Sequence, residues 1–264
     1  MSRVSQSQSV DRYLAELALL RKPGTARDAR WTMMEFLEFA PGNRTDTRSA
    51  ILEYLRFCRE RCNSPRTVQK KLVRVLSFYR WLGQPVKIPM PTVPNPLPEV
   101  YSEAELTAIM TYANGDRLLF KTLLQSGLRA NEAAHLRRAN LLDRGIQVAP
   151  YKDWSPKNSE ERVITVPAAL ITELRTVPTE YVFPLTMYSM LRRLKSTAKR
   201  AGLNPDDCWL HRFRANFATT LLRAGVDVRT VAAQLGHRSL APTLRYLALV
   251  GDAALQAKGE SVWK

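Results

Sequence analysis

A proline-rich stretch at residues 85–98 constrains the fold of this chain more than any other part of the sequence. It contains six of the 16 prolines and no glycine. Proline cannot continue a helix, and each proline biases the residue before it towards an extended conformation. We therefore expect a stiff, extended linker here, with one domain over residues 1–84 and a second over residues 99–264.

Both sides of this linker are basic. The chain has 40 Lys and Arg against 24 Asp and Glu, a net charge of +16 and a pI near 10.2. Residues 1–98 carry 17 basic against 8 acidic side chains, and residues 99–264 carry 23 against 16. Such an excess is typical of proteins that bind nucleic acid or an anionic membrane. Two basic halves on one chain favour a clamp around a single polyanion.

The hydrophobic pattern argues against a membrane partner. No apolar run approaches the roughly 18 residues that span a bilayer, and the N-terminal residues are too polar for a signal peptide. Hydrophobic residues make up 45% of the chain, which is enough for a globular core. We therefore expect a cytoplasmic protein whose partner is nucleic acid.

The three cysteines are Cys58, Cys62 and Cys208, which form neither a disulfide framework nor a zinc set. Cys58 and Cys62 lie four residues apart, so a regulatory or metal-binding role stays open. Packed thiols in a reducing cytoplasm are the favoured interpretation. We predict no metal and no cofactor.

The first 84 residues predict a bundle of four helices. Apolar residues recur near every 3.6 positions, with breakers between the periodic segments. The predicted helices cover residues 10–20, 25–40, 47–61 and 64–82. Basic side chains follow one side of the fourth helix, and we favour contact with the DNA backbone over a merely solvated face. These side chains are Arg66, Lys70, Lys71 and Arg74.

The second half predicts a mainly α domain with a small antiparallel β-sheet. Ser102 and Glu105 form a capping box before a helix that runs to about residue 113. Further helices are expected near residues 116–125, 129–136 and 187–201, and short strands at 146–149 and 162–166. A polar loop, residues 152–161, joins the two strands.

The most informative motif begins at His211 and ends at Tyr246. His211 and Arg214 lie three residues apart, so on a helix both point to one side. A Leu-Gly-His sequence ending at His237 follows, and Tyr246 comes nine residues after that histidine. Two histidines, an arginine and a hydroxyl nucleophile suit attack on a phosphodiester without a metal ion.

This stretch resembles the C-terminal catalytic box of the tyrosine recombinases, the family of phage integrases, Xer proteins and Cre. The family pattern is H-x-x-R, then L-G-H, then a tyrosine nine residues later. Upstream, Gly127-Leu-Arg129 with Glu132 resembles the first arginine box of the family. The resemblance implies an N-terminal core-binding domain over residues 1–84 and a tyrosine-recombinase catalytic domain over residues 99–264.

One departure from the family concerns the residues after Arg214. They are Ala215 and Asn216, where the family often has His-Thr. The contacts that support Arg214 are therefore expected to differ from those of relatives.

The resemblance also implies a catalytic lysine in the loop between the two predicted strands. In the family this lysine lies five residues before the arginine of a K-x-x-x-x-R strand motif. Lys157 stands five residues before Arg162 and is the favoured candidate. Lys152, on the other side of Pro156, is the rival.

The chemistry explains this set of side chains. Negative charge builds up on the phosphate oxygens during attack. Arg129 and Arg214 can neutralise it, because each planar guanidinium group presents two parallel N–H donors to the phosphate. A phenol has a pKa of about 10, so Tyr246 needs help to lose its proton. His211 is the candidate base and His237 the candidate phosphate donor, and the sequence leaves these two roles exchangeable. Glu132 is expected to support Arg129, and the resemblance implies that Lys157 protonates the departing 5′ oxygen.

We expect a site-specific tyrosine recombinase that cleaves and rejoins DNA through a 3′-phosphotyrosyl intermediate, for integration, excision or resolution. The 3′-phosphotyrosyl link conserves the free energy of the phosphodiester, so we expect no need for ATP. Fixed cationic side chains take the place of a metal ion, so we expect no metal either. The expected partners are double-stranded DNA with inverted-repeat core sites and further copies of the chain, a dimer on each site and a tetramer on two. Accessory proteins and nucleoid association fit the same expectation. The alternatives are a non-catalytic sequence-specific DNA-binding protein and a strand transferase like type IB topoisomerases or telomere resolvases.

Overall fold

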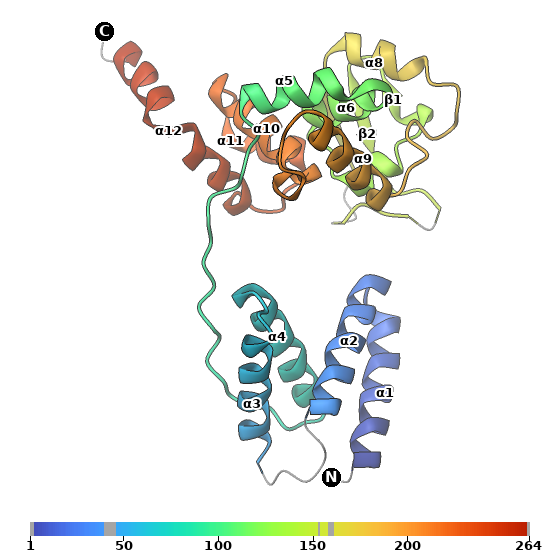
Figure 1. Ribbon diagram of the computed structural model, residues 1–264, viewed down its shortest axis with the longest axis vertical. Coiled ribbons are helices and arrows are strands. Elements are labelled where there is room, and N and C mark those ends of the chain that lie inside the picture. Colours follow the sequence, from blue (N-terminus) through green and yellow to red (C-terminus); the bar gives the residue numbers. More distant parts are fainter. Residues whose placement is uncertain (1–2, 40–45, 153, 158–160, 263–264) are drawn as a thin grey trace. The chain divides into compact units, whose positions relative to one another are not determined.

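The computed structural model describes residues 3–39, 46–152, 154–157 and 161–262, with side chains described between residues 7 and 251. The chain divides into two compact units, Met1–Pro96 and Leu97–Lys264. Figure 1 shows the elements of each unit, coloured along the sequence. The predicted fold class, mainly α with a small antiparallel sheet, is confirmed.

The first unit is a bundle of four helices, as the spacing of apolar residues predicts. Asp46 and Ser64 cap α3 and α4 through their side chains, and Pro65 occupies the first turn of α4. Buried aromatic rings, among them Phe36, Tyr54 and Phe78, fill the core. The helices are α1 (Arg3–Leu20), α2 (Pro23–Phe39), α3 (Thr47–Glu60) and α4 (Pro65–Trp81).

The proline-rich stretch contains neither helix nor strand. Its first part follows the surface of the helical bundle, where Val86 and Ile88 pack against the core. Arg48 donates a hydrogen bond to the carbonyl of Lys87 at 2.6 Å, and Gln69 donates one to that of Pro91 at 3.3 Å. The helical unit therefore fixes the beginning of the linker.

The second unit contains the remaining helices and a three-stranded antiparallel sheet of order β1-β2-β3. The strands are β1 (Leu141–Leu142), β2 (Gly145–Val148) and β3 (Arg162–Thr165), with Ile146 opposite Ile164. The helices are α5 (Glu103–Tyr112), α6 (Arg117–Ser126), α7 (Ala130–Ala134), α8 (Ala168–Arg175), α9 (Met187–Arg200), α10 (Leu210–Arg223), α11 (Val228–Leu235) and α12 (Ala241–Val262), with a kink at Gly251 in the last.

Helices α8, α11 and α12 and strand β1 were absent from the sequence-based expectation. Helix α8 follows Pro167 and buries Leu170, Ile171 and Leu174, a helical spacing confined to eight residues. Strand β1 has only two residues, too few for any periodicity to be visible. The short elements α8 and β1 were missed because short segments carry little pattern.

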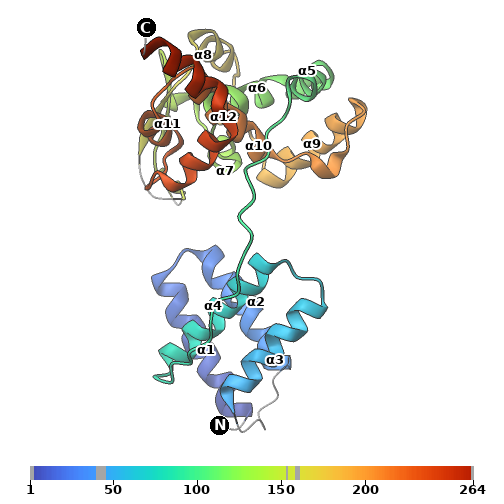
Figure 2. The same ribbon diagram turned by 90° about the vertical axis from the view of Figure 1, so that its left-hand side faces the viewer.

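Helix α10 lies at the centre of the second unit, in contact with α6, α11 and α12. Figure 2 shows α11 and α12 beside it. Its inner face buries Phe213, Phe217 and Leu222. Asn216 lies on the same helix and pairs with the backbone of Tyr101, accepting from its N–H at 2.9 Å and donating to its carbonyl at 2.7 Å. These bonds attach the start of the unit to α10.

None of the helices that the structure describes is both long and apolar enough to cross a bilayer.

The paired bonds of Asn216 generate a stability prediction. Asn216→Ala leaves the buried N–H and carbonyl of Tyr101 without partners, and each such loss costs about 1–3 kcal/mol. We expect urea unfolding, followed by circular dichroism, to show a loss of that order. Asn95→Ala, an exposed linker position, is the matched control and should change little. Equal stability of the two variants would contradict the assigned role of Asn216.

Candidate active site

The C-terminal end of α11 gathers three arginines from distant parts of the second unit. The last carbonyls of a helix have no partners within it, and the helix dipole makes this end negative. The carbonyl oxygens of residues 234–236 accept, in chain order, from Arg162 Nε at 3.0 Å, Arg214 Nη2 at 2.5 Å and Arg129 Nη2 at 3.3 Å. One helix end therefore holds three guanidinium groups.

Two glycines make these approaches possible. Gly236 ends α11 with φ of 63°, and a Cβ there would lie 3.0 Å from the side chain of Arg162. Gly127 ends α6 with φ of 60°, and a Cβ there would lie 2.4 Å from the ring of Phe217. The carbonyl of Gly127 accepts a hydrogen bond from Arg214 Nη1 at 2.7 Å. Glycine is needed at both positions for its positive φ and for its lack of a side chain.

Glu132, on α7, joins Arg129 to Arg162. Its carboxylate accepts from the N–H of Arg129 at 2.9 Å and from Arg129 Nη1 at 2.8 Å. It also accepts from Arg162 Nη2 at 2.7 Å and Nη1 at 3.2 Å, a bidentate pair. The expected support of Arg129 by Glu132 is confirmed by these contacts. Arg162 was not among the predicted site residues, because only the fold brings β3 next to α7.

The partners of Glu132 favour the ionised form of its carboxylate. The carboxylate is almost completely buried, with 4% of the residue exposed, and burial alone would raise its pKa. The hydrogen bonds and charges of Arg162 and Arg129 outweigh that effect and hold the pKa of Glu132 below its ordinary value. The carboxylate is therefore ionised at neutral pH and holds Arg129 in place.

Arg214 is the most deeply buried of the site arginines, with 1% of its surface exposed. Burial, followed by the charge of Arg129, lowers its pKa to about 9, so it stays charged at neutral pH. Its Nη atoms bond to two carbonyls and to His237 Nε2, whereas its Nε has no partner within the described part of the chain. A rigid, charged donor group therefore stands at the centre of the site.

His237 is held as a neutral imidazole. A guanidinium can only donate, so His237 Nε2 accepts from Arg214 Nη2 at 3.1 Å. The ring proton is then on Nδ1, which donates to Thr243 Oγ1 at 2.8 Å. Burial, followed by the charge of Arg214, lowers the pKa of His237 to about 4. Donation from Nε2 to a phosphate would need a second proton on this ring, which the negative charge of the phosphate favours.

Thr243 is a second residue that the sequence did not indicate. It is fully buried near the start of α12 and fixes the tautomer of His237. Threonine is common near helix N-termini, so nothing in its sequence position distinguished it.

His211 and Tyr246 meet beside the arginines. His211 lies in the first turn of α10, and its Nε2 is 3.5 Å from the hydroxyl of Tyr246 on α12. Tyr246 is 4% exposed, and burial raises its pKa against the lowering effect of Arg214. Partial removal from water, then the charges of Arg214, Arg129 and Lys157, lower the pKa of His211. A neutral His211 is the form that can accept the phenol proton.

The two candidate lysines lie in different surroundings. Lys157 is exposed, and its charge acts on His211, which places it on the side of the site. Lys152 lies over the ring of Tyr151, with Nζ 5.0 Å from the ring centroid. The structure therefore brings Lys157, rather than Lys152, towards the other site residues.

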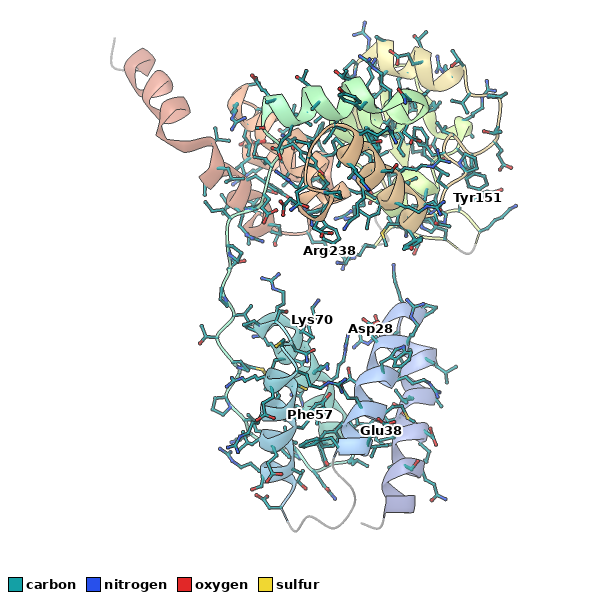
Figure 3. All side chains as sticks on the ribbon, in the orientation of Figure 1. Asp28, Glu38, Phe57, Lys70, Tyr151 and Arg238 are labelled. Atoms are coloured by element: carbon teal, nitrogen blue, oxygen red, sulfur yellow. The ribbon has the colours of Figure 1, made fainter. Side chains whose placement is uncertain are left out.

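The candidate DNA contacts of α4 are not equivalent. Arg66 and Lys70 are exposed, and Figure 3 shows Lys70 extending away from the helix. Lys71 forms an ion pair with Glu35 at 2.6 Å, and Arg74 forms one with Asp28 at 2.9 Å. These two charges are already partly neutralised by α2.

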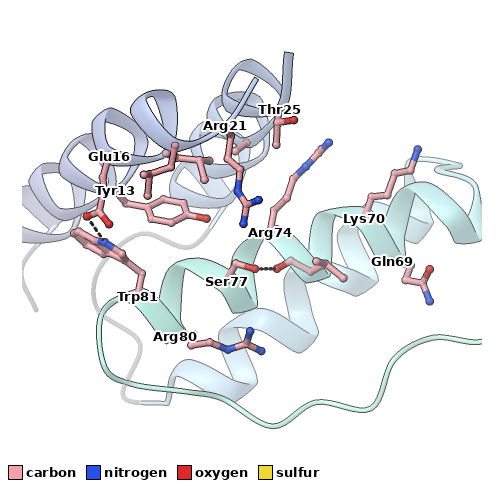
Figure 4. Close-up of a pocket in the computed structure, with 14 residues that line it drawn as sticks. Tyr13, Glu16, Arg21, Thr25, Gln69, Lys70, Arg74, Ser77, Arg80 and Trp81 are labelled. Carbon is pink, nitrogen blue, oxygen red and sulfur yellow. Dashed lines mark hydrogen bonds between the residues drawn. The ribbon is translucent and has the colours of Figure 1, made fainter. Parts of the chain in front are cut away.

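Lys70 and Arg74 line a groove between α1 and α4. The groove has a volume of about 660 Å³ and also includes Arg21, Arg80 and Trp81 (Figure 4). Its wall is basic, and Trp81 is fixed by a 2.7 Å hydrogen bond to Glu16.

Among the residues that the structure describes, no group of three or more His, Cys, Asp or Glu side chains is placed to hold a metal ion. Cys58 and Cys208 are buried thiols and Cys62 is exposed. The charge in the site comes from fixed guanidinium groups.

Comparison with known proteins gives consistent results. A model described as the phage integrase family matches residues 99–250. Tyrosine recombinase XerD of Rickettsia bellii is 27% identical over 220 residues, which cover 69% of this chain and 72% of that protein. Tyrosine recombinase XerC of Erythrobacter litoralis is 30% identical over 213 residues, with coverage of 69% and 68%.

Solved structures share the fold. The Tn1549 transposon integrase in complex with a circular intermediate DNA matches with a TM-score of 0.80 at 16% identity, covering 97% of this chain and 99% of that one. A lambda integrase dimer bound to a COC′ core site matches with a TM-score of 0.75 at 14% identity, covering 94% and 95%.

The buried pairing of Glu132 generates a pH prediction. Glu132→Gln leaves two arginines without their anion, and breaking a buried pair costs about 3–5 kcal/mol. Because the folded pKa is lowered, this stabilisation is present above the unfolded value near 4.3 and is lost as the pH falls through the folded pKa. We expect the free energies of unfolding of the variant and the unsubstituted protein to differ at pH 7 and to converge in acid.

Chemical denaturation at several pH values measures this difference. Glu99→Gln removes an exposed carboxylate and is the matched control. A difference between Glu132→Gln and the unsubstituted protein that does not change between pH 7 and pH 3 would contradict the assigned ion pairs.

Proposed function

The chain belongs to the phage integrase family of tyrosine recombinases, and on that premise we propose that it is a site-specific recombinase that cleaves and rejoins DNA strands through Tyr246. The single observation that carries the proposal is the position of the Tyr246 hydroxyl. It lies 3.5 Å from His211 Nε2, and the charge of Arg214 acts on it. A nucleophile, a base and fixed positive charge therefore occur at one place.

The first step transfers the scissile phosphate to the protein. Tyr246 Oη attacks phosphorus while its proton passes to His211, and the bond from phosphorus to the 5′ oxygen breaks. Arg129 and Arg214 neutralise the charge on the non-bridging oxygens, a contribution on the order of 3 kcal/mol per donor. Lys157 gives the proton that the 5′ oxygen needs in order to leave. The product is a 3′-phosphotyrosyl link and a free 5′-hydroxyl.

His237 has a different role in this proposal. Its Nε2 faces Arg214, and Thr243 holds its other nitrogen. When a phosphate enters, Arg214 turns its donor to the phosphate oxygen, and His237 takes up a proton and donates beside it. His211, which contacts Tyr246, is then the principal base.

Rejoining is the reverse of the first step. A 5′-hydroxyl of a second strand attacks the phosphotyrosyl link, and Tyr246 leaves. The free energy of the ester is conserved throughout, so the reaction needs no ATP. It also needs no metal ion, because fixed positive charge is already present. The guanidinium groups supply the charge that Mg²⁺ supplies in metal-dependent strand transfer.

In this proposal the helical unit binds the same DNA as the second unit, so that the two act as a clamp. Its core-binding surface includes Arg66 and Lys70 on α4, with Lys71 and Arg74 beside them. The net positive charge of both halves supports contact of both with one duplex. Because DNA is the substrate, nucleoid association belongs to the same proposal.

The active assembly in this proposal is a dimer on each inverted-repeat core site and a tetramer on two paired sites. Support comes from relatives, since one similar structure is a lambda integrase dimer bound to a core site and another is XerH bound to a palindromic substrate. In this chain, α12 continues past Gly251 away from the body of its unit (Figure 1). Accessory proteins can add to this assembly.

A nicked suicide substrate tests the proposal. Tyr246→Phe removes only the nucleophilic oxygen, so we expect complete loss of covalent protein–DNA complexes on denaturing gels and unchanged binding in band-shift assays. The assay contains excess EDTA and no nucleotide, and the unsubstituted protein should still form the adduct. Tyr112→Phe, at an exposed position, is the matched control.

Four results would contradict the proposal. A covalent adduct with Tyr246→Phe would remove Tyr246 from its role, and loss of the normal adduct in EDTA would exclude a metal-free reaction. Binding without any adduct in the unsubstituted protein would favour a non-catalytic DNA-binding protein. Relaxation of supercoiled DNA by a monomer, without pairing of sites, would favour the topoisomerase-like alternative.

A further inference from the structure

A cluster of ring and basic side chains lies at the base of the loop that carries Lys157, and the mechanism above does not use it. Its members come from the end of α7, the loop after β2 and the segment before α9. We call it the aromatic clamp, and it consists of His135, Arg137, Tyr151, Trp154 and Tyr181. Tyr151 is labelled in Figure 3, on the side of the unit opposite α12.

The loop reverses direction between Tyr151 and Trp154. Each of these residues donates its backbone N–H to the carbonyl of the other, and both distances are 2.9 Å. Lys152 has a φ of 47°, which lies in the left-handed region. The backbones of Tyr151 and Trp154 are therefore held against each other by two hydrogen bonds.

One face of this turn is attached to α7. The imidazole of His135 stacks on the indole of Trp154, with ring centroids 4.6 Å apart and planes inclined by 10°. His135 Nδ1 donates to the carbonyl of Asn131 at 2.7 Å, so the imidazole is itself fixed to the helix. Helix α7 begins immediately after Arg129 and carries Glu132. The stack thus connects the loop to the helix that positions the first site arginine.

A second contact holds the other side of the turn. The guanidinium of Arg137 lies over the ring of Tyr151, 3.2 Å from its centroid. Arg137 also pairs through its backbone with Tyr181. Cation–π contacts contribute on the order of 1 kcal/mol each, enough to favour one loop position over others.

Trp154 is the member of the aromatic clamp that lies closest to Lys157 in the sequence. Its indole packs against the hydrophobic core, and its Nε1 has no partner among the described residues, so ring contacts hold it. Only Ser155 and the buried Pro156 separate it from Lys157. A short segment anchored at Trp154 and at Pro156 restricts the positions that Lys157 Nζ can reach.

We propose that the stack of His135 on Trp154 is the positioning device for Lys157, setting the ammonium group against the departing 5′ oxygen. The inference rests on the proposed function, in which Lys157 is the proton donor. His135 and Trp154 are positioning residues, because they act through the loop and touch no reacting atom.

The leaving group offers a test that distinguishes misplacement of Lys157 from a general loss of stability. With the natural substrate, the bond from phosphorus to O5′ breaks and the oxygen takes a proton from Lys157 Nζ. In a 5′-bridging phosphorothiolate, sulfur replaces O5′ and leaves as a thiolate, which needs no proton. A defect confined to proton donation therefore disappears on the sulfur substrate, whereas a defect in phosphate binding or in the nucleophile remains.

The experiment compares single-turnover cleavage of nicked suicide DNA containing oxygen or sulfur at the 5′ bridge. Misplacing a catalytic group by about 1 Å costs on the order of 100-fold, so Trp154→Ala and His135→Ala should slow cleavage of the oxygen substrate by about that factor. Both should cleave the sulfur substrate at the rate of the unsubstituted protein. Trp154→Phe keeps a ring for the stack and should retain most activity on both substrates. Tyr112→Ala removes an exposed ring outside the clamp and is the matched control.

Lys157→Ala separates this inference from the function on which it rests. It should lose cleavage of the oxygen substrate and regain it with sulfur. If Lys157→Ala regains cleavage but Trp154→Ala and His135→Ala are equally slow on both substrates, the clamp does not position the lysine and the inference is wrong. If Lys157→Ala stays inactive with sulfur, its role as proton donor fails, and the inference fails with it. If the alanine variants do not fold, His135→Gln, which removes one ring of the stack and keeps a polar side chain at this position, provides the same oxygen-to-sulfur comparison.

Discussion

Three guanidinium groups converge on the carbonyl oxygens of residues 234–236 at the end of α11, and the arrangement of the site depends on this contact. Arg129, Arg162 and Arg214 come from three separate segments, and their mutual repulsion would separate them without a negative counterpart. The end of the helix provides unpaired acceptors and a partial negative charge, and Glu132 provides a full one. The site therefore exists before any phosphate arrives, which lowers the reorganisation needed for catalysis.

The same charges set the protonation of the histidines. Burial, followed by the charges of Arg214 and Arg129, lowers the pKa values of His237 and His211 and favours their neutral forms. A neutral His211 can receive the proton of Tyr246, and His237 accepts from Arg214 until a phosphate competes for that donor. The sequence motif leaves the roles of the two histidines exchangeable, and their different neighbours, Tyr246 and Thr243, distinguish them.

The sequence predicted the four helices of the first half, several helices of the second half and two strands of the small sheet, because periodic apolar spacing and capping residues are local signals. It also singled out Arg129, Lys157, His211, Arg214, His237 and Tyr246 as one constellation, which the structure brings to one side of the second unit. Arg162 and Thr243 escaped prediction, because their importance comes from contacts across the fold and not from spacing. The pairing of Lys71 and Arg74 with acidic residues of α2 was hidden for the same reason. Local pattern identified the reacting groups, and only tertiary contacts revealed what positions them.

The central claim is that Arg129 and Arg214, held by the end of α11, act together on a single phosphate. A crystal structure of the protein on nicked DNA, with vanadate in place of the scissile phosphate, measures this directly. We predict that both guanidinium groups donate to oxygens of the same vanadate, that Tyr246 Oη occupies one apical position, and that Arg129 stays bonded to Glu132. Guanidinium groups bound to different phosphates, or Arg214 remaining on His237 with vanadate elsewhere, would contradict it.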